Sequence, residues 1–153
     1  MINIFLDSNI LYNDPLMKYG YNKQLMERIK RIGGNIFICD VVYKETLNNY
    51  KKRLENINAE IDKLNLNINK ILIDSDSIKK IEVEREVEKL REEIDRYIKE
   101  GIIQNIKVNN DILPEVINRA IQRKKPFSEK KEEFRDCVIW LTYVNKAEKD
   151  NLT

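Results

Sequence analysis

Two short apolar stretches, separated by a segment long enough for one helix, constrain the fold of this chain most. Residues 2–6 (INIFL) and 35–39 (NIFIC) are almost wholly apolar, as is typical of strands buried on both faces of a parallel sheet. Between them, residues 16–32 carry apolar side chains at three- and four-residue spacing and end at Gly33-Gly34, which predicts an amphipathic helix. Strand, helix and strand in this order predict a right-handed crossover and an α/β fold with a parallel sheet flanked by helices.

Length and composition indicate one soluble, helix-rich domain. The chain has 153 residues, of which 35% are charged and 42% hydrophobic, with only 4 Gly and 3 Pro, a balance that excludes a disordered protein. Its net charge is only +2, so binding to nucleic acid would need a local basic patch. No stretch approaches the roughly 20 apolar residues of a membrane span, and no signal sequence follows Met1, so we expect a cytoplasmic protein without membrane contact.

The residue types that are scarce limit the chemistry. The chain has no histidine and two cysteines, Cys39 and Cys137, both in apolar segments, so we expect reduced, packed thiols and no structural zinc site. Without histidine the usual general base is missing. Acid–base or metal chemistry would have to use Asp and Glu.

Three carboxylates occupy comparable places in the predicted elements. Asp7 ends the first strand, Glu45 lies in the second turn of a helix for which Asp40 is a plausible N-cap, and Asp136 lies one or two turns into a helix over residues 132–148. Ligands of open α/β sheets bind at the carboxyl ends of the strands, and Mg²⁺ and Mn²⁺ prefer oxygen ligands. A shared metal site is one interpretation. The other is that the acids stabilise helix N-termini, with Asp7 as a cap.

Neighbouring residues have weaker candidate roles. Asn9 would position a metal-bound water or hold Asp7, or would simply cap the next segment. Ser8 would contact a phosphate or a metal-bound water, and Glu133, one turn before Asp136, is a supporting ligand or a solvated acid. For Trp140 we expect a place in the core rather than a surface for stacking bases.

A long heptad pattern separates the two ends of the chain. Apolar residues recur at three- and four-residue steps over 47–71 and again over 83–97, with an interruption at 74–77, which predicts an antiparallel helical hairpin inserted over 47–100. Two limbs of about 24 residues would form an arm of about 36 Å. The arm is either a packing device or a surface for a protein partner or self-association.

A basic segment precedes the last helix. A helix is predicted over 112–123. From its last turn, at Arg119, through Pro126 to Lys131, the sequence holds only one acid, Glu129, among six basic residues: Arg119, Arg123, Lys124, Lys125, Lys130 and Lys131. If the fold is as predicted, this segment lies on the rim of the acidic cluster, where cations would attract RNA phosphates.

The motifs FLDSNIL, VVYKETL and KPF followed by EEFRDCVIWL resemble the successive motifs of the PIN-domain family. The resemblance implies a metal-dependent ribonuclease, as in toxins, RNA turnover or defence, with Mg²⁺ or Mn²⁺ held by Asp7, Glu45 and Asp136. Family members usually continue with a strand that carries a fourth acidic or Asn/Asp position, whereas this sequence ends at Asn151-Leu152-Thr153. We therefore expect residues 1–153 to be a single, C-terminally incomplete PIN-like domain. The alternative function is a catalytically incomplete scaffold that binds a partner or its own copy through the arm.

Overall fold

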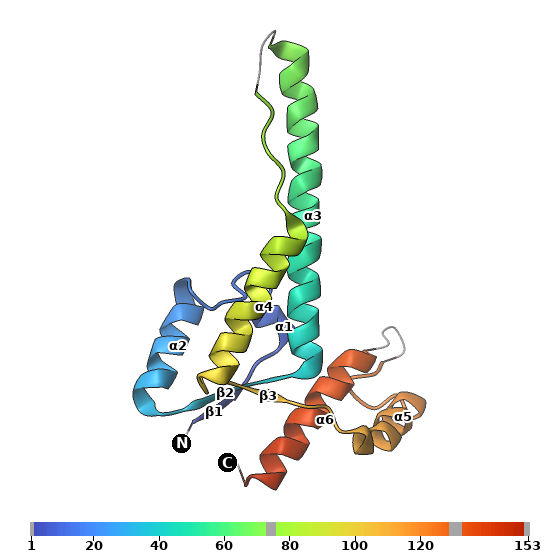
Figure 1. The fold of residues 1–153 in the computed structure, drawn as a ribbon. Coiled ribbons are helices and arrows are strands. Elements are labelled where there is room, and N and C mark those ends of the chain that lie inside the picture. The colour runs from blue at the N-terminus through green and yellow to red at the C-terminus, as the bar shows by residue number, and fades with distance from the viewer. Residues whose placement is uncertain (1, 73–75, 129–132, 152–153) are drawn as a thin grey trace.

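The computed structural model describes residues 2–72, 76–128 and 133–151, and its centre is a three-stranded parallel sheet (Figure 1). The strands β1 (Asn3–Phe5), β2 (Asn35–Cys39) and β3 (Ile103–Ile106) lie in the order β1-β2-β3. Ile36 is in register with both Ile4 and Ile103. The α/β class and the parallel sheet are therefore confirmed.

The central position of β2 in the sheet explains why its sequence, NIFIC, is almost wholly apolar. Ile36, Phe37, Ile38 and Cys39 are each no more than 2% exposed, because β2 has a neighbour on both edges and helices pack on its faces. A strand in this position cannot alternate polar and apolar residues.

Helix α2 (Gly20–Ile32) connects β1 and β2 after the short helix α1 (Ser8–Leu11). It begins four residues later than predicted, since the Asp14 carboxylate accepts the backbone N–H groups of Lys18 and Tyr19 at 2.9 and 2.8 Å and holds that stretch in a turn. Gly33 ends the helix with a φ of +66°. A Cβ on Gly34 would lie 2.8 Å from the Ile2 carbonyl oxygen, so the second glycine permits the close approach to β1.

The predicted hairpin exists, but its two limbs differ. Helix α3 (Asp40–Ile71) has 32 residues, whereas α4 (Val83–Lys99) has only 17, and residues 76–82 run beside α3 without helical structure. Asn58 bonds both the N–H and the C=O of Ile81, and Asn65 does the same for Ile78, at 2.8 and 2.9 Å. These side chains bind backbone groups that a helix would pair internally, so the expectation of two equal helical limbs was wrong.

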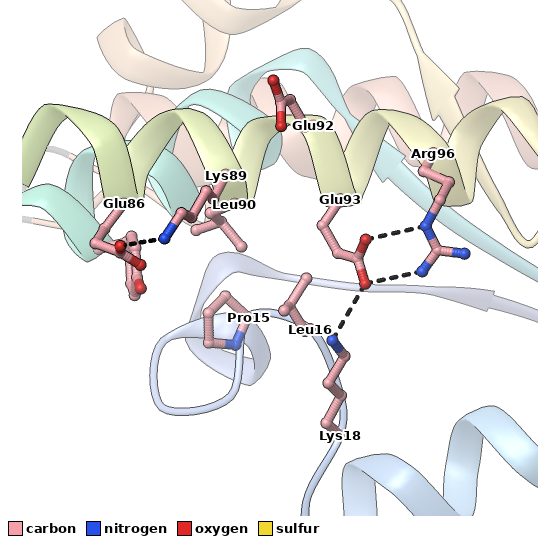
Figure 2. A pocket seen from close by; sticks show the side chains of 10 residues that line it. Pro15, Leu16, Lys18, Glu86, Lys89, Leu90, Glu92, Glu93 and Arg96 are labelled. Atoms are coloured by element: carbon pink, nitrogen blue, oxygen red, sulfur yellow. Dashed lines mark hydrogen bonds and ion pairs between the residues drawn. The ribbon is translucent and has the colours of Figure 1, made fainter.

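The base of the arm belongs to the main core. Leu47 of α3 packs in the same cluster as Leu90, Ile94 and Tyr97 of α4. Figure 2 shows how the N-terminal segment is fastened to α4: Lys18 and Arg96 both pair with Glu93, at 3.1 and 2.8 Å. Farther out, five large apolar residues are exposed: Leu64, Leu66, Ile71, Leu72 and Ile78.

The remaining elements form a second, smaller core. The 3-10 helix η1 (Asn110–Ile112) runs into α5 (Leu113–Ile121), and α6 (Phe134–Lys149) packs against α5. Their shared cluster contains five buried residues: Ile112, Val116, Phe127, Cys137 and Leu141. Cys39 and Cys137 are buried free thiols, as predicted. None of the helices in the described ranges combines the length and the apolar character that crossing a membrane would require.

Candidate active site

Asp7 is a helix cap as well as a candidate metal ligand. Both oxygens of its carboxylate accept hydrogen bonds from neighbouring residues. It follows β1 and is the N-cap of α1, where its Oδ1 accepts the Ser8 backbone N–H at 2.7 Å. The amide of Asn9 donates to Oδ2 at 2.7 Å, and the Ser8 hydroxyl lies 3.5 Å from Oδ1. Asn9 therefore holds the Asp7 carboxylate in place.

Glu45 lies in the second turn of α3, as expected from the sequence. Its side chain is only 15% exposed, and it accepts a hydrogen bond from the guanidinium of Arg135 on α6. The capping role expected for Asp40 was wrong: Cys39 occupies the N-cap position, Asp40 is the first helical residue, and its Oδ1 accepts the Asn105 amide at 3.0 Å.

Asp136 lies in the first turn of α6, earlier than predicted. Burial raises the pKa of its carboxyl, and so does repulsion from Glu133, then from Asp7, with a Glu133 hydrogen bond and the Glu45 charge acting in the same direction. Charges act on one another strongly only over short distances. The fold thus brings Asp7, Glu45, Glu133 and Asp136 into electrostatic contact from three separate segments of the chain.

The donor atoms of this cluster are of the type that a hard divalent cation prefers. Within residues 2–72, 76–128 and 133–151, no three carboxylate or thiol side chains lie in positions that would hold a metal ion. The cluster offers only oxygen donors, which Mg²⁺ and Mn²⁺ prefer, and the repulsion that raises the pKa of Asp136 is what a cation would relieve. The Arg135 guanidinium supplies positive charge to Glu45. The residue types therefore fit such a metal.

Tyr143 supports this edge of the sheet and was not singled out from the sequence. Its hydroxyl donates to the carbonyl of Leu6 and accepts the N–H of Cys39 at 3.2 Å, and burial raises its pKa. It thereby ties the ends of β1 and β2 to α6. The available signal was its position seven residues after Asp136, which places both on one face of a helix.

The basic segment is only partly described. Arg119 and Lys125 line a cavity of about 750 Å³ together with Asp136, and Arg123 and Lys124 are exposed beside them. Lys130 and Lys131 lie outside the described residues. Trp140 also lines this cavity and is 45% exposed, so its expected place in the core was wrong.

A second cavity, between α4 and the segment around Pro15, has no carboxylate of this cluster in its wall (Figure 2). Three acids line it, Glu86, Glu92 and Glu93, and Glu86 and Glu93 are paired with Lys89 and Arg96 at 2.6 and 2.8 Å. The acidic cluster at the ends of β1 and β2 is therefore the stronger candidate site.

Comparison with known proteins supports the same conclusion. A family model described as a PIN domain matches residues 4–153. No curated protein and no solved structure matches the chain. The match spans nearly the whole sequence and includes the segments of Asp7, Glu45 and Asp136. The chain therefore belongs to the PIN-domain family, whose fold is in general that of nucleases.

Proposed function

We propose that the chain is a metal-dependent endoribonuclease that hydrolyses phosphodiester bonds of RNA, with Asp7, Glu45 and Asp136 as the ligands of Mg²⁺ or Mn²⁺. The observation that carries this proposal is that Asp7 after β1, Glu45 in α3 and Asp136 in α6 come together from distant segments. In keeping with this, burial, then Glu133, then Asp7 and lastly Glu45 raise the pKa of Asp136. Three acids from distant segments repel one another at the carboxyl ends of the strands, where α/β folds bind ligands. Such repulsion is retained at functional sites more often than elsewhere.

Some residues of the chain would shape the metal site, and others would bind the RNA. When bound, a divalent cation supplies an activated water and neutralises charge on the leaving oxygen. Asn9 and the Ser8 N–H orient Asp7, which limits the geometry in which its carboxylate is presented. Arg135, 75% exposed and adjacent to Asp136, provides a guanidinium that suits a phosphate. Lys124 and Lys125 attract the RNA backbone.

Three substitutions that preserve side-chain size test the assignment. Asp7→Asn, Glu45→Gln and Asp136→Asn should each lower cleavage of single-stranded RNA in Mn²⁺ by about a hundredfold or more, since even the loss of a residue that only supports a ligand costs about 10- to 100-fold. Asp40→Asn is the matched control, because Asp40 lies at the start of α3 and bonds Asn105 instead. Parental activity in Asp7→Asn, or activity of the parent in EDTA, would overturn the proposal.

The exposed arm favours a second candidate function, self-association of a scaffold. The apolar stripe of α3 is covered near the sheet, where Leu54 is 7% exposed, but Leu64 and Ile71 are 51% and 79% exposed. A heptad stripe is complementary to another copy of itself, so a second copy of the chain is the partner that fits best.

Shortening the arm separates the two functions. Asn58 lies beside Ile81, so replacing residues 62–79 by a short Gly-Ser turn should leave the base of the arm intact. If the arm is the functional surface, sedimentation should show a dimer for the parent and a monomer for the shortened chain. The same oligomeric state for the two chains would contradict self-association through the arm. RNA cleavage should be unchanged by the deletion.

A further inference from the structure

Two acids of the candidate cluster, Glu133 and Asp136, line a cavity whose other walls carry different chemistry. It measures about 750 Å³ and is open to the surface. It combines an aromatic and apolar part with cationic and acidic groups: Arg119, Lys125, Pro126, Phe127, Asp136 and Trp140. A planar apolar group with an attached anion would match this combination.

Trp140 forms the aromatic wall, and its indole packs against Arg119, which also lines the cavity. The Arg119 guanidinium lies 4.6 Å from the centre of the indole ring, and Arg119 is itself fixed by Glu115 at 2.7 Å and by the carbonyl of Lys125 at 3.0 Å. Even so, Trp140 remains 45% exposed. An indole that is braced but exposed can stack on a ligand at little cost in side-chain entropy.

The same helix presents Asp136 and Trp140 one turn apart, so both face the same side of α6. A ligand against Trp140 is therefore adjacent to the candidate hydrolytic cluster, and Lys125 on the facing segment offers a charge for its anion. Aromatic faces beside basic groups are the usual means of holding single-stranded nucleic acid, whose bases stack and whose phosphates bind cations.

We propose that this cavity is a subsite for one nucleobase of a single-stranded RNA, stacked on Trp140, with the adjoining backbone directed to Lys125. The proposal rests on the proposed function, because the occupant is the substrate of that site. Stacking alone is tolerant of sequence, so the subsite places the strand relative to the carboxylates without selecting one base.

The only tryptophan of the chain reports directly on this subsite. The full chain is titrated in EDTA, which keeps the strand intact, with oligouridylate and with an abasic ribose-phosphate oligomer of equal length, and indole fluorescence is recorded. Oligouridylate should quench the fluorescence, and the abasic oligomer should not. Equal quenching by the two oligomers would overturn the proposal.

Substitutions add a second, independent measurement by fluorescence anisotropy of labelled RNA. Trp140→Leu should weaken binding of oligouridylate about tenfold, while Trp140→Phe keeps an aromatic face and should retain most of the affinity. Tyr21→Leu is the control, since Tyr21 is 88% exposed on α2. An unchanged affinity of Trp140→Leu for oligouridylate would overturn the proposed subsite. The alternative occupant of the cavity would then be a side chain of a partner protein. Base-dependent quenching by a chain that never cleaves RNA would support the subsite and refute only the nuclease.

Discussion

The guanidinium of Arg135 donates to the carboxylate of Glu45, and this contact joins α6 to α3 across 90 positions of sequence. Arg135 is 75% exposed, whereas Glu45 is only 15% exposed. An exposed guanidinium is thus paired with a carboxylate that the proposed metal would need. The proposed metal would therefore have to compete with Arg135 for this carboxylate.

Arg135→Ala should therefore strengthen Mn²⁺ binding. We expect the Kd to fall by up to about fivefold, the range of an exposed ion pair, as measured by isothermal titration calorimetry. Arg85→Ala is the control, because Arg85 is paired with Glu82 on the arm at 3.2 Å. Weaker binding of Mn²⁺ to Arg135→Ala than to the parent would show that Arg135 does not compete with the metal.

Asp136→Asn should stabilise the metal-free protein at neutral pH. The folded-state pKa of Asp136 is raised by burial and by Glu133, Asp7 and Glu45, so the folded state binds this proton more tightly than the unfolded state does. Stability consequently falls as pH rises from the unfolded pKa through the folded one, and the ionised carboxylate is destabilising above both. In EDTA at pH 7, we expect Tm of the variant to exceed that of the parent by about 2 °C.

The gain in Tm should disappear at about pH 3, which is below the unfolded-state pKa of an aspartate, because Asp136 is then protonated in both states. Thermal unfolding followed by circular dichroism at several pH values checks this dependence. Glu92→Gln, which removes an exposed acid from α4, corrects for the change in net charge. A gain that is equal at pH 3 and pH 7 would contradict the assigned repulsion.

Changing Lys124 and Lys125 together to Ala should weaken RNA binding and flatten its dependence on salt. Both side chains are exposed, and Lys125 lines the cavity beside Asp136. Each lost phosphate contact should lower the slope of log K against log salt by about 0.7 for a single strand. Catalysis at saturating RNA should change much less. Lys70→Ala with Lys79→Ala on the arm is the charge-matched control, and an unchanged slope in the first pair would exclude a contact between the basic segment and phosphate.

Tyr143→Phe should destabilise the fold without touching the acids. The variant loses the hydroxyl that bonds the Leu6 carbonyl and the Cys39 N–H, and the loss of these two hydrogen bonds should cost about 1–3 kcal/mol. Urea unfolding should show a lower midpoint with the same m-value. Tyr21→Phe should leave the midpoint unchanged, because Tyr21 is 88% exposed. Equal midpoints for the two variants would show that the Tyr143 hydroxyl does not stabilise the sheet edge.

The sequence alone was sufficient to predict the parallel sheet, its first crossover helix and the family. Burial on both faces requires continuous apolar strands, and residues 36–39 are nearly inaccessible to solvent. Gly33-Gly34 marked the helix end because only glycine accommodates both the left-handed turn and the approach to Ile2. Asp7, Glu45 and Asp136 were chosen because each lies next to such an element. Their roles, and the interpretation of the domain as C-terminally incomplete, stay predictions.

Only the tertiary structure decided which side chains meet. Periodicity predicted two similar limbs for the arm, but Asn58 and Asn65 pair with the backbone of residues 78 and 81 and keep that segment extended. Apolar type alone placed Trp140 in the core, whereas α6 directs it into a cavity beside Arg119. The contacts of Arg135 and Tyr143 join segments 90 and 137 positions apart. The periodicity of apolar residues predicts which face of a helix or strand is buried. It does not predict which other element packs against that face, because this depends on how the elements are arranged in space.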